Sequence, residues 1–229
     1  MSAPVALLPR SREEARRKIA RAWEMRYRPT YARRLDRIPC REELPAVLNA
    51  RGLTRIGVEV GVRRGTYSHL LLWNWKGEKL ISIDPWLEDA RDAYVDKSNV
   101  SQSKHERLYE DTKKRLAPFG PRSEIWRLTS VQAAERLQDR SIDFVYVDAR
   151  HDYDSVLEDL RAWFPKVRAG GVLAGHDYVT GTFPQGEFGV RKAVDEFFGE
   201  RGIPVFTTQP RPPADPFATW LVQIPRVPS

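Results

Sequence analysis

The strongest constraint on the fold is a regular alternation of β and α patterns that begins near residue 55. Short runs rich in β-branched residues are followed by stretches with apolar side chains at helical spacing, and turn residues separate them. The expected strands cover 55–62, 79–84, 123–128, 142–148 and 172–176, and the expected helices cover 66–75, 103–116, 131–137, 153–167 and 190–198. This order is typical of an α/β domain with helices on both faces of a parallel sheet.

Two further β patterns lie near the C-terminus, over 204–208 and 218–224, and the Pro-rich loop 209–217 joins them. This loop has no room for a crossover helix, and parallel neighbours need one, so we expect these strands to pair antiparallel. The fold class that follows is α/β: a doubly wound sheet of seven strands, mostly parallel, with the last strand antiparallel.

Residues 1–52 precede the alternation and are expected to form a helical extension. Ser11-x-x-Glu14 is a capping-box pattern, and apolar residues at helical spacing follow it to about residue 27. A second helical stretch, 41–50, ends at Gly52, a residue suited to cap a helix C-terminus. We expect 1–52 to act as a cap or a homo-oligomerisation arm and 53–229 to form one domain.

Composition narrows the class of protein. Cys40 is the only cysteine, so the chain can form no intramolecular disulfide. The first apolar run is too short for a signal-peptide core and no stretch reaches membrane-spanning length, so we expect a cytoplasmic protein without a membrane partner. The formal net charge is +7, but the basic residues are scattered among acidic ones, which favours a solvated surface over a nucleic-acid interface.

The first strand ends in a glycine-rich turn, Glu59-Val-Gly61-Val-Arg-Arg-Gly65. Ligands of open α/β sheets bind beyond the carboxyl ends of the strands, and glycines let them approach the backbone. The carboxylate of Glu59 would repel a dinucleotide pyrophosphate, but it suits the ammonium and sulfonium groups of S-adenosylmethionine (SAM). The glycine spacing also departs from the G-x-G-x-x-G pattern of NAD-binding proteins.

The ends of the next two strands carry further candidates. A carboxylate at Asp84 can accept both ribose hydroxyls of a nucleotide, in SAM and NAD sites alike. Thr129-Ser130 either bonds the adenine edge or caps a helix, and Trp86 either stacks on adenine or packs within its loop. The predicted cofactor-binding residues are Glu59, Gly61, Gly65, Ser68, Asp84, Trp86, Ser130 and Asp148.

Four segments together resemble class I SAM-dependent methyltransferases: Glu59-x-Gly61-x-x-x-Gly65, Ile83-Asp84, Phe144-Val-Tyr-Val-Asp148 and Gly170-Gly-Val-Leu-Ala-Gly-His-Asp177. The resemblance covers about residues 53–224. Asp148-Ala-Arg-His151 and Gly175-His-Asp177-Tyr are similar to the branch of macrolide-sugar O-methyltransferases and, more distantly, to catechol-type enzymes. The resemblance implies a Rossmann-like methyltransferase fold, SAM as cofactor, and methylation of a hydroxyl on a small molecule, a sugar or phenol of secondary metabolism.

The same resemblance implies a divalent cation, Mg²⁺ or another, held by Asp148 and Asp177, with His151 as a catalytic base. Elementary chemistry agrees, because a hard cation on carboxylates acidifies a hydroxyl and a histidine accepts its proton near neutral pH. One position departs from the family, which commonly has a second Asp or Asn where this sequence has Tyr178. His176, Asp152 or water would have to complete the coordination.

Other activities remain open at this point. N-methylation of a small molecule is the nearest alternative, and an NAD-dependent oxidoreductase or a catalytically silent cofactor-binding module are alternatives from other classes. We do not expect methylation of a nucleic-acid base, since the fourth strand ends in Asp148-Ala-Arg-His and not in an Asp/Asn-Pro-Pro-aromatic motif. The loops 87–103, 179–188 and 209–217 are expected to select the acceptor.

Overall fold

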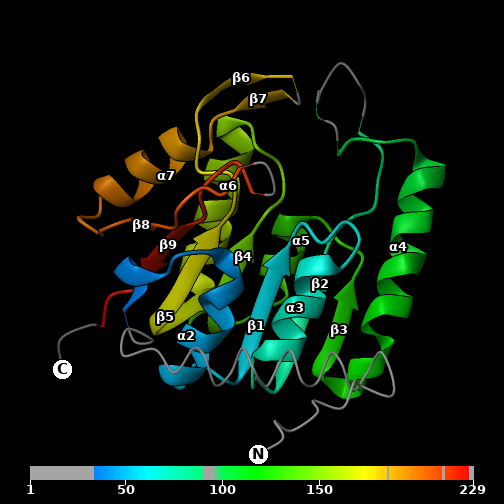
Figure 1. Ribbon diagram of the computed structural model, residues 1–229, viewed down its shortest axis with the longest axis horizontal. Helices are drawn as coiled ribbons and strands as arrows, with labels where there is room; N and C mark the ends of the chain where they lie inside the picture. The colour runs from blue at the N-terminus through cyan, green and yellow to red at the C-terminus, as the bar shows by residue number, and fades with distance from the viewer. Residues whose placement is uncertain (1–33, 90–95, 97, 185, 213–214, 227–229) are drawn as a thin grey trace, which may run out of the picture.

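The computed structural model describes residues 34–89, 96, 98–184, 186–212 and 215–226, and Figure 1 shows their arrangement. The helix expected over 11–27 lies outside the described residues. The main sheet contains β1 (Ile56–Val60), β2 (Lys79–Ile83), β3 (Ser123–Trp126), β4 (Ile142–Val147), β5 (Val167–Gly175), β8 (Phe206–Thr207) and β9 (Trp220–Gln223). The α-helices are α2 (Leu44–Ala50), α3 (Thr66–Asn74), α4 (Gln102–Leu116), α5 (Ser130–Glu135), α6 (Tyr153–Trp163) and α7 (Val190–Gly199).

The strand order of the seven-stranded sheet is β3-β2-β1-β4-β5-β9-β8. β1 pairs in parallel with β2 on one side and with β4 on the other, so the winding reverses at β1. β9 runs antiparallel to both of its neighbours, β5 and β8. The predicted α/β class, the doubly wound sheet and the reversed last strand are therefore confirmed, and the reversal at β1 places a ligand crevice between β1 and β4.

Two apolar layers hold helices against the sheet, and β4 contributes to both because its side chains alternate. Val145 packs in the layer that contains α5, α6 and α7, whereas Phe144 and Tyr146 pack in the layer that contains α2 and α3. All six residues of β4 are buried, as a central parallel strand requires. Figure 1 shows helices in front of and behind the sheet.

The described part of the N-terminal segment covers one face of the sheet. It comprises the short 3₁₀ turns η1 (Leu35–Arg37) and η2 (Arg41–Glu43) and then α2. Leu44 and Leu48 of α2 are fully buried in the same layer as Phe144. Gly52 has a φ of +68°, and the N–H of Leu53 returns to the carbonyl of Leu48, so glycine closes this helix as expected.

Two local differences from the expected elements bear on the site. The loop over 179–188 contains a hairpin, β6 (Gly181–Phe183) and β7 (Gly186–Phe188), which no strong alternation predicted. The expected helix 153–167 stops at Trp163 and gives way to η4 (Phe164–Lys166), because Pro165 cannot continue it. The remaining 3₁₀ segment is η3 (Ala117–Arg122). Every helix in the described part of the chain is too short or too polar to cross a membrane.

Candidate active site

A cavity of about 1080 Å³ opens at the carboxyl edge of the sheet, where the winding reverses. Residues that follow five strands of the main sheet, β1 to β5, line it. The structure brings together in this one cavity most of the residues predicted for the site: Glu59, Gly61, Asp84, Ser130, Asp148, His151 and Asp177. The volume lies slightly above the upper end of the usual range for a single small ligand, which is compatible with a donor and an acceptor together.

The turn after β1 depends on glycine. Gly61 has a φ of +87°, and a Cβ at this position would lie 1.9 Å from the carbonyl oxygen of Asp148. The close approach brings the end of β1 against the end of β4, so the two groups of predicted residues meet. Gly65 has a φ of +69° and precedes α3, where a Cβ would meet Thr112 at 3.0 Å. Gly65 therefore shapes the turn and is not among the described residues that line the cavity.

Glu59 lines the cavity although it is only 2% exposed. Burial raises the pKa of its carboxyl to about 8, against the opposing effect of the hydroxyl of Ser68, which donates a hydrogen bond to it. Ser82 in turn donates to Ser68 at 3.0 Å. The hydrogen bond from Ser68 thus fixes the orientation of the Glu59 carboxyl. Because this carboxyl is desolvated, a cationic ligand would strongly stabilise its ionised form.

Asp84 connects the ends of β1 and β2. Its Oδ2 accepts hydrogen bonds from the backbone N–H groups of Val62 at 3.0 Å and Arg63 at 2.7 Å, and its Oδ1 accepts one from the N–H of Trp86 at 2.7 Å. Each carboxylate oxygen has two lone pairs, so acceptor capacity remains for a ligand hydroxyl. Burial raises the pKa of Asp84 and these backbone bonds oppose the rise.

Trp86 takes the packing role of the two that the sequence allowed. Its side chain is fully buried, with Nε1 donating to the carbonyl of Arg63 at 2.8 Å and the ring centroid 4.8 Å from that of Tyr109. It packs with Val62 and Leu108 beneath the turn and is not among the described residues that line the cavity. The structure therefore gives Trp86 a packing role beneath the turn, and its contact with the cofactor stays a prediction.

After β3, the two roles considered for Thr129-Ser130, capping a helix and contacting adenine, fall to different residues. Thr129 is the N-cap of α5, in a capping box with Gln132. Ser130 lines the cavity, and its Oγ accepts a hydrogen bond from Nε1 of Trp163 at 2.8 Å. Ser130 therefore stays a candidate for contact with the base of a nucleotide.

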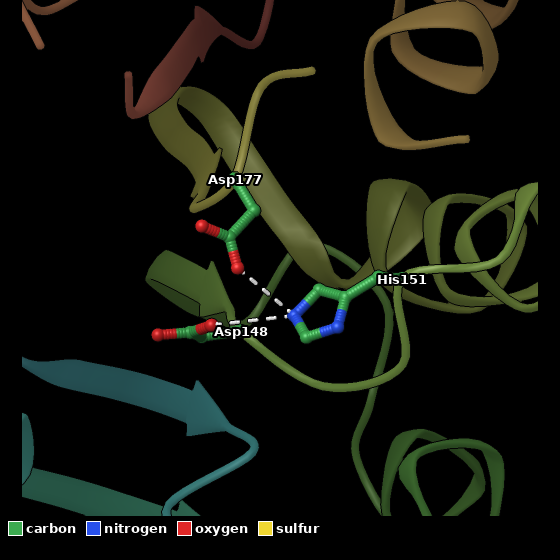
Figure 2. Close-up of side chains that lie close together, drawn as sticks. All are labelled: Asp148, His151 and Asp177. Carbon is green, nitrogen blue, oxygen red and sulfur yellow. Dashed lines mark ion pairs between the residues drawn. The ribbon is translucent and has the colours of Figure 1, made fainter. Parts of the chain in front are cut away.

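Two acids and a histidine form a compact cluster at the ends of β4 and β5, shown in Figure 2. Nε2 of His151 lies 3.0 Å from Oδ2 of Asp177 and 4.0 Å from Oδ1 of Asp148. Asp177 has a φ of +51°, a strained conformation for a residue with a side chain, as often occurs at functional sites. One ligand atom from each of the three residues lies within 4.8 Å of the others, a spacing that suits a single metal ion.

The remaining contacts of His151 fix the orientation of its ring. Nδ1 lies 3.1 Å from Oδ2 of Asp96, and the ring stacks on Phe188 with centroids 4.5 Å apart. A nitrogen lone pair at Nε2 and the Asp177 carboxylate attract each other only when a proton or a cation lies between them. The donor set of the cluster therefore fits a divalent cation, and His151 joins the two predicted ligands in it.

Among the described residues, the group whose ligand atoms converge contains neither Asp152 nor His176, the two side chains considered as replacements for the ligand missing at Tyr178. The hydroxyl of Tyr178 donates to Asp195 on α7, and Asp152 caps α6 by accepting from the N–H of Ser155 at 3.0 Å. His176 is held between two carboxylates: its Nδ1 lies 2.7 Å from Asp177 and its Nε2 lies 2.7 Å from Asp215. Burial lowers the pKa of His176, but the bond to Asp177 and the nearby acids outweigh it and raise the pKa overall.

Arg41 enters the cavity from the N-terminal segment, a contact that sequence reasoning missed. One guanidinium nitrogen donates to Oδ2 of Asp148 at 3.4 Å, and Nε lies 3.8 Å from Asp215. Arg41 and Asp148 are 107 positions apart, and no local pattern relates them. The predicted N-terminal extension therefore contributes a cation to the same cavity.

Aromatic side chains border the acid-histidine cluster. Phe188 of β7 and Phe217 of the Pro-rich loop both line the cavity, with ring centroids 5.8 Å apart. Phe183 of β6 packs behind both rings. Two loops that were expected to select the acceptor thus supply an apolar wall beside the cluster.

A family model described as "Methyltransferase domain" matches residues 58–178, just over half of the 229-residue chain. The chain belongs to this methyltransferase family. The match includes the turn after β1 and the ends of β2, β4 and β5, so the resemblance to class I SAM-dependent methyltransferases is confirmed. This methyltransferase domain also matches 55 residues of an uncharacterized protein from Sinorhizobium fredii at 36% identity, over 24% of this chain and 6% of that protein. The chain therefore spans a small fraction of that relative.

Two solved structures share the fold of this methyltransferase domain. An O-methyltransferase from Bacillus cereus in complex with SAH has a TM-score of 0.58 and 16% identity, over 95% of this chain and 93% of that one. The O-methyltransferase TomG from Streptomyces achromogenes, involved in tomaymycin synthesis and in complex with SAM, has a TM-score of 0.55 and 19% identity, over 81% and 79% of the two chains. At these identities the likeness concerns the fold alone.

Proposed function

We propose that this methyltransferase transfers the methyl group of SAM to a hydroxyl of a small molecule. The observation that carries the proposal is the convergence of two half-sites in one cavity. Glu59 and Asp84 form an acidic half beside the glycine turn, and Asp148, His151 and Asp177 form the half at the ends of β4 and β5. The first half suits a cationic nucleoside donor and the second suits removal of a proton from an acceptor.

Methyl transfer is an in-line displacement in which the bond from carbon to the acceptor oxygen forms as the bond from carbon to sulfur breaks. The acceptor hydroxyl must lose its proton for the product to be neutral. His151 lines the cavity, its Nε2 lies between the carboxylates of Asp148 and Asp177 and would receive this proton, and Asp96 on the other ring nitrogen holds the imidazole in place. Asp148 and Asp177 stabilise the imidazolium that results.

The same cluster supports a proposal of metal assistance. Asp148, Asp177 and His151 would hold a divalent cation, which binds an acceptor hydroxyl and lowers its pKa. A histidine that held the cation through Nε2 would not also accept the proton at that atom, and the proton would then have to leave to solvent. Arg41 beside Asp148 supplies a resident positive charge at the same place.

The walls of the cavity favour an acceptor with an aromatic or otherwise apolar body, a phenol over a sugar. Phe188 and Phe217 present rings beside the cluster, where a planar acceptor gains from stacking. The acceptor we propose is a small molecule and not a nucleic acid or a membrane component.

The test is production of S-adenosylhomocysteine (SAH) from SAM with panels of phenols, sugars, amines and nucleosides as acceptors. We expect turnover with hydroxyl acceptors, and His151→Ala should lower it roughly 10²–10⁴-fold with SAM affinity unchanged. His69→Ala is the matched control, because His69 stacks on Trp73 away from the cavity and should leave turnover intact. Turnover confined to amines or nucleosides would overturn the proposed acceptor class, and absence of SAM binding would overturn the donor.

A further inference from the structure

A buried carboxyl that the proposed reaction does not use lines the far end of the cavity. Asp159 lies on the inner face of α6 and is only 4% exposed. It shares that end of the cavity with the segment that follows β3, which includes Leu128, Thr129 and Ser130. The acid-histidine cluster occupies the ends of β4 and β5 instead, so Asp159 belongs to a different part of the cavity.

The neighbours of Asp159 determine which way its hydrogen bonds run. Oγ of Ser130 accepts the indole N–H of Trp163 at 2.8 Å, so the hydroxyl hydrogen of Ser130 is available to the carboxyl of Asp159, with which it bonds. Burial raises the pKa of Asp159 to about 7, and the bond from Ser130 opposes the rise. Burial removes water from this carboxyl, and a further N–H donor from a ligand stabilises a desolvated acceptor.

The order of the strands indicates which part of a nucleoside lies there. The glycine turn follows β1, Asp84 follows β2, and Ser130 follows β3, and these three strands are neighbours in the sheet. With the cationic end of the donor at Glu59 and the ribose at Asp84, the base extends toward Ser130 and Asp159. Adenine carries one exocyclic amino group, whose N–H bonds are donors.

We propose that Asp159 accepts a hydrogen bond from the exocyclic amino group of the donor's adenine and so makes the site selective for adenine over purines that lack this group. The inference rests on the proposed function, since it assigns the base subsite of the same donor. The pairing holds in either protonation state. An ionised carboxyl accepts the amino N–H, and a neutral one accepts it through its carbonyl oxygen while its O–H donates to N1 of the ring.

The experiment compares two ligands that differ only in the amino group: SAH and its 6-deamino analogue, in which purine riboside replaces adenosine. Calorimetry with the wild-type protein should show weaker binding of the analogue, on the order of ten- to a hundredfold, because the buried carboxyl loses its donor. Asp159→Leu is close in size and carries no acceptor, so it should bind both ligands with affinities within about twofold. Asp159→Asn keeps a carbonyl acceptor and should retain a preference for SAH.

Controls separate the possible failures. Glu158→Gln changes a neighbouring acid of the same cavity and should keep the wild-type preference for SAH. Asp159→Ala provides a second acceptor-free variant if Asp159→Leu fails to fold, as judged by thermal denaturation. Equal affinity of the wild-type protein for SAH and its analogue, or an unchanged preference in an acceptor-free variant, overturns the role of Asp159 and leaves the proposed function standing. Lack of any SAH binding by the wild-type protein overturns the proposed function itself.

Discussion

Replacing Glu59 with glutamine should change how the affinity for SAM depends on pH. The carboxyl of Glu59 has a pKa of about 8 because it is buried, and a cationic donor binds best when the carboxyl is ionised. In the wild-type protein each pH unit below 8 therefore costs about a factor of ten, the free energy of removing the proton from Glu59. Glutamine does not ionise, so the affinity of Glu59→Gln for SAM should lack this pH dependence.

The quantity to measure is the ratio of the two dissociation constants, variant over wild type, by calorimetry at pH 6 to 9. The ratio should rise by about tenfold per pH unit between pH 6 and 8 and level off above pH 8. The donor's own amino group also titrates in this range, but it is the same in both titrations and cancels in the ratio. Glu43→Gln is the control, since Glu43 is equally a buried acid with a raised pKa but is not among the described residues that line the cavity.

A ratio that stays constant with pH would show that no ionised carboxylate at position 59 faces the donor, and the assignment of the cationic half-site would fail. Stability of the free protein supplies an independent check. The folded-state pKa of Glu59 lies above its ordinary value of 4.5, so the native state holds the extra proton and its stability falls as pH rises from about 4.5 to 8. The loss is at most about 5 kcal/mol. In Glu59→Gln, denaturant unfolding at several pH values should show a free energy of unfolding that falls correspondingly less as pH rises.

Three further outcomes follow from the site. Asp84→Ala should weaken SAM binding by on the order of 1–3 kcal/mol, and unchanged affinity would remove Asp84 from the ribose subsite. Gly61→Ala should destabilise the fold by about 2 kcal/mol or more, because its Cβ would lie 1.9 Å from the carbonyl oxygen of Asp148 at a φ of +87°; denaturant unfolding measures this, and wild-type stability would refute the steric argument. Dialysis against a chelator should abolish turnover and Mg²⁺ should restore it, whereas full activity after dialysis would exclude an essential cation.

The architecture and the location of the site were predictable from the sequence because their signals are local. Runs of β-branched residues mark the strands, and glycine and proline mark the turns between elements. Parallel strands bring their carboxyl ends to one edge, so Glu59, Asp84, Asp148 and Asp177 had to lie near each other once the fold class was known. The cavity that they line follows from the same rule.

Side-chain orientation and contacts between distant segments were decided only by the tertiary structure. Trp86 follows a strand end as a binding residue would, yet its ring packs against Tyr109 and is not among the described residues that line the cavity. Arg41 reaches Asp148 across 107 positions, and Asp96 and Asp159 approach the site from a loop and from a helix. The periodicity of a sequence predicts which face of a helix or strand is buried. Contacts between elements depend on how their surfaces pack together, and this packing leaves no periodic pattern in the sequence.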